Sequence, residues 1–202
     1  HTLEGHPDWV NSVAWNSNGT LLVSGSGDTL IKIWDSKTWK CIQTLGGLEG
    51  HTHPVSSVTW NVQGTLLASG SMYKTIKIWD SKTWKCVQTL EGHTQGVYSV
   101  TWNSNGTLLA SGSSDHTIKI WDTQTWKCIQ TLEGHTQWVS SVAWNSQGRL
   151  ASGSWDKTIK IWDSNTRKCV QTLEGHTDYV SSVVWNSQGR LASGSSDKTI
   201  KI

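Results

Sequence analysis

Serine, histidine and aspartate, the three residue types of a hydrolase triad, recur together along this chain of 202 residues. His93, Ser111 and Asp115 form one such set, and Trp121 follows it. A hydrolase needs one activated nucleophile, whereas these four residue types return at nearly constant spacing throughout the sequence. We therefore predict that the chain is not an enzyme and that the sets form structural networks from these residues: His6, Ser24, Asp28, Trp34, His51, Ser69, Trp79, His93, Ser111, Asp115, Trp121, His135, Ser152, Asp156, Trp162, His176, Ser193 and Asp197.

Two of the sets are incomplete. In the second set Tyr73 occupies the position of the aspartate, so that His51 lacks a carboxylate partner. In the fifth set the sequence ends at Ile202, before the position of the tryptophan. We expect the second repeat to be the least firmly held of the complete repeats.

The elements that position these sets are repeats of about 42 residues. Within each repeat, short runs rich in Val, Ile, Thr and Trp, such as 139–144, are separated by Gly, Asn, Asp and Ser, as is typical of antiparallel hairpins. Apolar residues on both faces of these runs require cover from both sides. The sequence predicts an all-β fold, a β-propeller of four-stranded antiparallel blades in a single domain, with repeats at about 5–49, 50–91, 92–133, 134–174 and 175–202, the fifth incomplete.

Successive repeats contain the same motifs in the same order and register: Gly-His, Ser-Gly-Ser, Asp and Trp-Asp. In this order the sequence resembles the WD-repeat family of β-propellers over essentially the whole chain. The resemblance implies that the Gly-His loop and the turn between the second and third strands share one rim of each blade, the top rim. It also implies how each set is joined: the aspartate accepts a hydrogen bond from the imidazole, the imidazole meets the serine hydroxyl, and the hydroxyl receives the indole N–H. The near-identical copies further resemble amplified repeat arrays in the sensor domains of large signalling proteins.

The repeats differ from one another mainly at positions that we expect on the top rim. Drift at exposed sites would vary the opposite turns equally, yet Asn-Ser-(Asn/Gln)-Gly and Lys-Thr-Trp-Lys-Cys hardly change. Trp and Tyr commonly anchor protein partners, and the variable positions resemble the partner-contacting ones of the heterotrimeric G-protein beta subunit. We predict that a protein or peptide binds here, or alternatively that a lectin-like or small-ligand sensor uses the same aromatics, with these contacts: Trp9, Asn11, Met72, Tyr98, Ser114, Trp138, Trp155, Tyr179 and Ser196.

Composition and charge exclude other classes of partner. The net charge is +2, which favours neither nucleic acid nor an anionic membrane. The three arginines fall away from the predicted top rim, so the sequence does not indicate a phosphopeptide reader. No cofactor or metal site is expected, because His51 and His53 have no cluster of cysteines or carboxylates nearby.

The cysteines and the fifth repeat give the remaining expectations. Cys41, Cys86, Cys128 and Cys169 occur once per repeat, so we expect them to be unpaired, small, buried residues of an intracellular, cytoplasmic protein. The fifth repeat lacks a fourth strand and should expose an unpaired edge. We expect either a longer array or self-association between copies to close the propeller.

Overall fold

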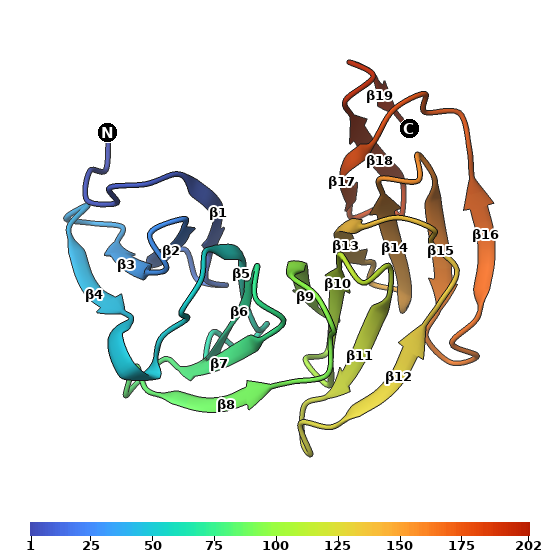
Figure 1. The fold of residues 1–202 in the computed structure, drawn as a ribbon. Helices are drawn as coiled ribbons and strands as arrows, with labels where there is room; N and C mark the ends of the chain where they lie inside the picture. The colour runs from blue at the N-terminus through green and yellow to red at the C-terminus, as the bar shows by residue number, and fades with distance from the viewer. The chain divides into compact units, whose positions relative to one another are not determined.

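The computed structural model describes residues 1–202 and consists almost entirely of β-strands (Figure 1). Nineteen strands form five antiparallel sheets, and the helical content is one turn of 3-10 helix, η1 (Gly47–Glu49). No helix is therefore long and apolar enough to cross a bilayer. Four sheets have four strands and the fifth has three, each in chain order. The predicted all-β fold of propeller blades with an incomplete fifth repeat is confirmed, and we number the sheets blades 1 to 5.

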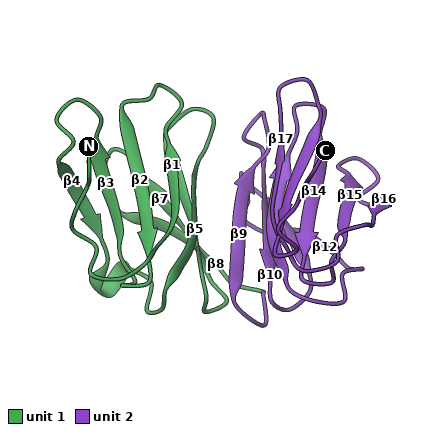
Figure 2. Cartoon of the chain, turned by 90° about the horizontal axis from the view of Figure 1, so that it is seen from above, with its two compact units in different colours: residues 1–92 green, residues 93–202 purple.

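The chain divides into two compact units, residues 1–92 and residues 93–202 (Figure 2). Unit 1 contains blades 1 and 2. Blade 1 consists of β1 (Val10–Trp15), β2 (Leu21–Ser26), β3 (Ile31–Asp35) and β4 (Cys41–Leu45). Blade 2 consists of β5 (Val55–Trp60), β6 (Leu66–Ser71), β7 (Ile76–Asp80) and β8 (Cys86–Leu90).

Unit 2 contains blades 3, 4 and 5. Blade 3 consists of β9 (Val97–Trp102), β10 (Leu108–Ser113), β11 (Ile118–Asp122) and β12 (Cys128–Leu132). Blade 4 consists of β13 (Val139–Trp144), β14 (Arg149–Ser154), β15 (Ile159–Asp163) and β16 (Cys169–Leu173). Blade 5 consists of β17 (Val180–Trp185), β18 (Leu191–Ser195) and β19 (Ile200–Lys201).

Side-chain hydrogen bonds fix the turns that join the strands. After β1, the Asn16 carboxamide oxygen accepts the N–H groups of Thr20 and Leu21 at 2.9 and 3.0 Å. After β3, Asp35 Oδ1 accepts both the hydroxyl and the N–H of Thr38 at 2.7 Å, and these bonds lower the pKa of the Asp35 carboxyl. Short polar side chains that bond to nearby backbone favour turns over continued strands. The aspartate of Trp-Asp thus ends the third strand of its blade.

Neighbouring blades within a unit pack closely because the second strand of each carries a glycine. A Cβ atom added to Gly25 in β2 would lie 2.6 Å from Val55 Cγ1 in β5. The same distance separates a Cβ atom at Gly153 in β14 from Val180 Cγ1 in β17. Both valines are completely buried, so any larger residue in place of the glycine would displace them. The repeated Ser-Gly-Ser segment is therefore needed for blade-to-blade contact.

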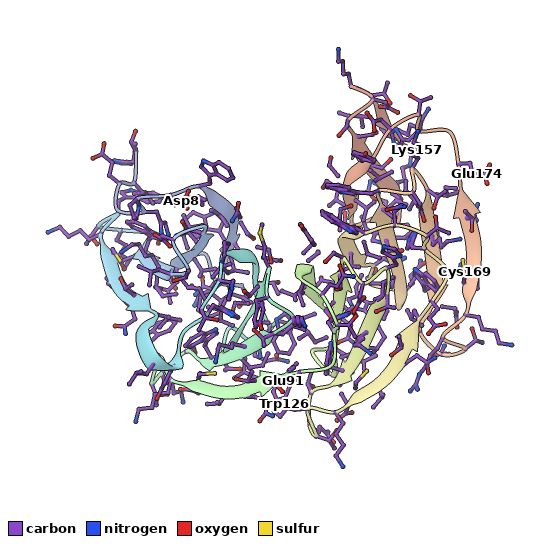
Figure 3. The ribbon with its side chains drawn as sticks, in the orientation of Figure 1. Asp8, Glu91, Trp126, Lys157, Cys169 and Glu174 are labelled. Atoms are coloured by element: carbon purple, nitrogen blue, oxygen red, sulfur yellow. The ribbon has the colours of Figure 1, made fainter.

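The cysteines are unpaired, but the prediction that they are buried is wrong. Cys41, Cys128 and Cys169 are exposed and Cys86 is half-buried. Each begins the fourth strand of its blade, and Cys169 lies on the outer strand β16 (Figure 3). The fourth strand pairs with only one neighbour, so its side chains lack the cover given to the second and third strands. The regular spacing of the cysteines indicated the repeat correctly, but it did not indicate that each cysteine lies on the fourth strand of its blade.

Candidate functional site

The Ser-His-Asp set of blade 3 forms one continuous chain of hydrogen bonds. His93, in the loop before β9, places Nδ1 2.8 Å from Asp115 Oδ2 and Nε2 2.7 Å from Ser111 Oγ. Trp121 in β11 donates its indole N–H to the same hydroxyl oxygen at 2.9 Å. A neutral imidazole satisfies every partner if Nδ1–H donates to the carboxylate and Nε2 accepts from Ser111. The network connects the loop before the first strand to the second and third strands.

Blades 1, 4 and 5 repeat this arrangement. The histidine Nδ1 lies 2.7 Å from the aspartate Oδ2 in each of them. The histidine Nε2 lies 2.7 to 2.9 Å from the serine hydroxyl, and the tryptophans of blades 1 and 4 donate to that hydroxyl at 2.8 Å. The members are His6, Ser24, Asp28 and Trp34 in blade 1, His135, Ser152, Asp156 and Trp162 in blade 4, and His176, Ser193 and Asp197 in blade 5.

Burial determines what these groups can do chemically. Ser111 and Ser152 have no exposed surface, so a substrate cannot reach either hydroxyl. Burial acts to raise the pKa of the Asp115 carboxyl, but hydrogen bonds from His93 and Thr117 and the attraction of His93 outweigh it and hold that pKa well below its usual range. A buried carboxylate with these donors is satisfied. The arrangement connects the loop to the strands of the blade, and the hydroxyls of Ser111 and Ser152 are inaccessible.

Blade 2 lacks the carboxylate. His51 Nε2 lies 2.7 Å from Ser69 Oγ, and Trp79 in β7 donates to the same oxygen at 2.9 Å, but the buried Nδ1 of His51 has no partner. Burial, followed by repulsion from Lys77, lowers the pKa of His51 to about 3. Tyr73, at the aspartate position, turns outward and stacks on His53 with ring centroids 4.3 Å apart. Blade 2 therefore holds its histidine in neutral form with one ring nitrogen unsatisfied.

The variable positions meet in pairs within each blade. The residue after the second strand donates its N–H to the carbonyl of the residue just before the first strand, at 2.8 to 3.0 Å. These pairs are Gly27 with Trp9, Met72 with Pro54, Ser114 with Gly96, Trp155 with Trp138, and Ser196 with Tyr179. Lys157, labelled in Figure 3, belongs to the turn that follows Trp155 and has a positive φ of 71°. The two most variable loops thus form one surface in every blade.

In unit 2 these loops and the start of β9 carry a continuous row of four aromatic rings. The ring centroids of Tyr98 in β9 and Trp138 lie 5.4 Å apart, and Trp138 lies 4.3 Å from Trp155. Trp155 stacks on Tyr179 at 4.6 Å with 13° between the ring planes. The row extends over blades 3, 4 and 5, and we call these residues the aromatic row. Tyr179 is exposed and the other members are half-buried.

The remaining predicted contact residues differ in accessibility. Trp9 is 81% exposed and Met72 is 41% exposed, both in unit 1. Asn11 donates its side-chain amide to the Val55 carbonyl at 3.0 Å, so this amide links blades 1 and 2. Ser114 is buried and donates its hydroxyl to the Gly96 carbonyl, whereas Ser196 is exposed. The side chain of Ser114 is therefore unavailable to a partner.

Sequence reasoning missed a second set of aromatic contacts, at the turns between the third and fourth strands. Trp39, Trp84 and Trp126 have positive φ values of 57° to 58°. Trp39 and Trp126 meet Trp15 and Trp102 edge to face, with centroids about 6 Å apart. The recurrence of Trp before Lys-Cys was a visible signal of this packing. The constancy of these turns reflects a structural role.

Comparisons with known proteins agree with the repeat organisation. A family model described as "WD domain, G-beta repeat" matches residues 1–35, 39–80, 84–122, 126–163 and 167–202. The chain is 51% identical over 43 residues to Protein ALTERED SEED GERMINATION 2 of Arabidopsis thaliana, which is 21% of this chain and 6% of that protein. It is also 51% identical over 45 residues to Polyadenylation factor subunit 2 of Gibberella zeae, covering 22% of this chain and 7% of that protein.

A third relative is the Probable E3 ubiquitin ligase complex SCF subunit sconB of Arthroderma otae. It is 44% identical over 45 residues, which is 22% of this chain and 7% of that protein. The matches thus span about one repeat and only a small fraction of each relative's length. They establish similarity of the repeat unit rather than of whole proteins.

Proposed function

Because the chain belongs to the WD-repeat family, we propose that it is a non-catalytic interaction module that binds an extended polypeptide across the aromatic row of unit 2. The observation that carries this proposal is the uninterrupted stack of four rings on three successive blades. Trp and Tyr are enriched among the residues that dominate binding energy at protein interfaces. Trp9 and Met72, exposed in unit 1, are proposed as further contacts.

The stacking favours a polypeptide over a small ring-shaped ligand. Each inner ring faces another ring at 4.3 to 5.4 Å, so the inner faces are already occupied. Sugars and methylated cations bind to free aromatic faces, whereas each inner ring of the row has a ring neighbour on either side. Mutual stacking also holds the rings in place before a partner arrives, which lowers the entropy lost on binding. A linear partner that crosses several blades uses all four residues.

The names of the relatives support a role in assemblies. One is a subunit of a polyadenylation factor and another is a subunit of an SCF ubiquitin ligase complex. We propose by analogy that this chain also serves as an interaction scaffold with a protein partner. The buried serines of blades 3 and 4 support the proposal that it has no hydrolase activity. An intracellular location and the absence of nucleic-acid and membrane partners stay predictions.

Selection from a random peptide library, followed by calorimetric affinities, tests this function. We expect peptides selected on the wild-type chain to bind the Trp138→Ser/Trp155→Ser/Tyr179→Ser variant at least about 30-fold more weakly, because the loss of even one anchor of about 2 kcal/mol has this effect.

A control variant removes three exposed apolar side chains from the fourth strands. Ile42, Val87 and Val170 are 50%, 51% and 48% exposed, and their triple serine variant should bind with wild-type affinity. Equal weakening in both variants contradicts a specific role for the aromatic row. Failure to select any peptide, together with binding on a glycan array, favours the lectin-like alternative.

A further inference from the structure

The turns at one end of the blades of unit 2 carry a cluster of positive charges. They join the first strand to the second and the third strand to the fourth, so they lie at the end opposite to the aromatic row, and we call them the lower rim. Five exposed cations lie in these turns or directly after them: Lys127, Arg149, Arg167, Lys168 and Arg190. Asp122 and Asp163 are the acidic residues of this rim, so positive charge dominates it although the whole chain has a net charge of only +2.

The two aspartates do not neutralise these cations. Asp163 Oδ1 accepts the N–H groups of Asn165 and Thr166 at 3.1 and 2.8 Å and the Thr166 hydroxyl at 3.0 Å. Asp122 holds the corresponding turn of blade 3 in the same way. The ion pairs of the structure all join a histidine to an aspartate of the buried networks. The cations of the lower rim therefore have no carboxylate partner within the chain.

All three arginines of the chain belong to the lower rim, and the local structure does not require them. Arg149 and Arg190 follow the turn glycine, where blades 1 to 3 have threonine. The Asn145 carboxamide accepts the Arg149 N–H at 2.8 Å, as the asparagines of blades 1 and 2 accept the threonine N–H at 2.9 Å, so the turn forms with either residue. Arg167 occupies the position of a tryptophan that packs edge to face in blades 1 to 3. Changes that add charge to one surface at the expense of packing are typical of selection for binding rather than for stability.

The Arg167 side chain brings two blades of the lower rim together. Its Nη1 donates to the Ile129 carbonyl of β12 at 3.1 Å, two residues after Lys127 of blade 3. Arg149, at the start of β14, is opposite Asp163 at the end of β15, and the turn that carries Arg167 begins directly after Asp163. A guanidinium has five N–H donors in a planar arrangement that fits a carboxylate, and Arg167 uses one of them within the chain.

We propose that the lower rim of unit 2 binds the carboxylates of an acidic polypeptide segment, with Arg149 and Arg167 as the main contacts. The unpaired guanidinium groups supply the donors, and Lys127, Lys168 and Arg190 extend the positive surface along the segment. The site lies at the end of the blades opposite to the aromatic row. It does not depend on the function proposed for that row.

The composition of the lower rim favours a polypeptide over a nucleic acid. Trp126 is the one aromatic residue in these turns of unit 2, and it packs against Trp102 with ring centroids 6.2 Å apart (Figure 3). The rim therefore has no series of rings on which successive bases could stack. Asp122 and Asp163 also interrupt the positive surface. A polypeptide can place its carboxylates to avoid them, whereas a nucleic acid carries a charge at every nucleotide.

Fluorescence anisotropy with a labelled peptide of alternating glutamate and glycine tests the proposal on the full chain at low ionic strength. We expect saturable binding that weakens as salt is added. Arg149→Gln/Arg167→Gln should weaken binding about tenfold, because it removes two charge-assisted contacts. The matched control is Lys157→Gln/Lys198→Gln, which removes the same charge from exposed turns at the other end of the blades and should keep wild-type affinity. No binding to the wild-type chain, or equal weakening in both variants, overturns the proposal.

Two further measurements separate binding from stability and identify the class of partner. Arg167→Trp restores the tryptophan of blades 1 to 3, so it should weaken peptide binding without unfolding the chain, and unchanged affinity would contradict the role of Arg167. The triple serine variant of the aromatic row should bind the acidic peptide normally. An oligothymidylate of equal length should bind more weakly than the peptide. Tighter binding of the oligonucleotide, lost in Arg149→Gln/Arg167→Gln, would overturn the assignment to a polypeptide.

Discussion

Replacing Tyr73 with aspartate should stabilise blade 2, because it supplies the carboxylate that the corresponding histidines have in the other blades. The buried Nδ1 of His51 has no partner, whereas the equivalent atom of His93 lies 2.8 Å from Asp115. Asp115 Oδ1 also accepts the Thr117 N–H at 3.0 Å, and an aspartate at position 73 should do the same for Thr75. The change therefore satisfies a buried group and tightens a turn.

The expected gain follows from two opposing contributions. An unsatisfied buried polar group costs about 1–3 kcal/mol. The substitution also removes the stacking of Tyr73 on His53, which contributes about 0.5–1.5 kcal/mol. We therefore expect the free energy of unfolding to rise by about 1 kcal/mol.

The same substitution should change the dependence of stability on pH. In the wild-type chain the pKa of His51 is lowered to about 3 from 6.5, so the unfolded state takes up a proton before the folded state does. The contribution of His51 to the free energy of unfolding is therefore fully present above about pH 6.5. It decreases as the pH falls below that value, by up to about 1.4 kcal/mol per pH unit. An aspartate at position 73 stabilises the imidazolium and raises the pKa of His51, so the loss on acidification should be smaller.

Urea unfolding followed by circular dichroism at about pH 7 and about pH 5 measures both effects. Hydrogen exchange in β5 to β8 assigns the change to blade 2, since unfolding of a repeat protein need not be two-state. The control is Tyr73→Asn, which loses the same stacking but supplies no charge. The reasoning is refuted if the aspartate variant unfolds at the same or lower urea concentration than the asparagine variant.

Two further substitutions test the packing of the blades. Gly153→Ala should destabilise the chain by about 1–3 kcal/mol because the added Cβ atom lies 2.6 Å from Val180 Cγ1. Gly194→Ala is the matched control, since its nearest neighbour is 3.9 Å away, and equal losses in thermal stability would contradict the packing account. Arg167→Trp should restore in blade 4 the edge-to-face contact with Trp144 and raise the free energy of unfolding by about 0.5–1.5 kcal/mol. An unchanged or lower melting temperature would show that the repeated tryptophan does not stabilise its turn.

Much of the fold could be predicted from the sequence because the repeat is short and regular. Asn-Gly turns and runs of Val, Ile and Thr predicted strands that agree with β1 to β19. The exposure of Cys169 was missed, although consecutive hairpins place the fourth strand of a blade at an edge, where its side chains have cover from only one neighbouring strand. The division after Gly92 into two compact units also has no signal in the repeat pattern.

The candidate site was predictable in part. Variation among the repeats pointed to Trp138 and Trp155, and a backbone hydrogen bond of 2.9 Å joins them. The stacking of Tyr98 on Trp138 was not foreseen, because it joins two different repeat positions on neighbouring blades. The burial of Ser114 was missed for a similar reason, since its hydroxyl finds the Gly96 carbonyl only in the folded blade.

The proposal that the aromatic row is a recognition surface is tested most directly by mapping where a selected peptide reduces hydrogen exchange. The account predicts protection of the loops at 136–138, 155–157 and 177–179, which carry Trp138, Trp155 and Tyr179 of the row, and unchanged exchange in β16 and β18. Protection confined to the fourth strands, with these loops unaffected, would contradict it.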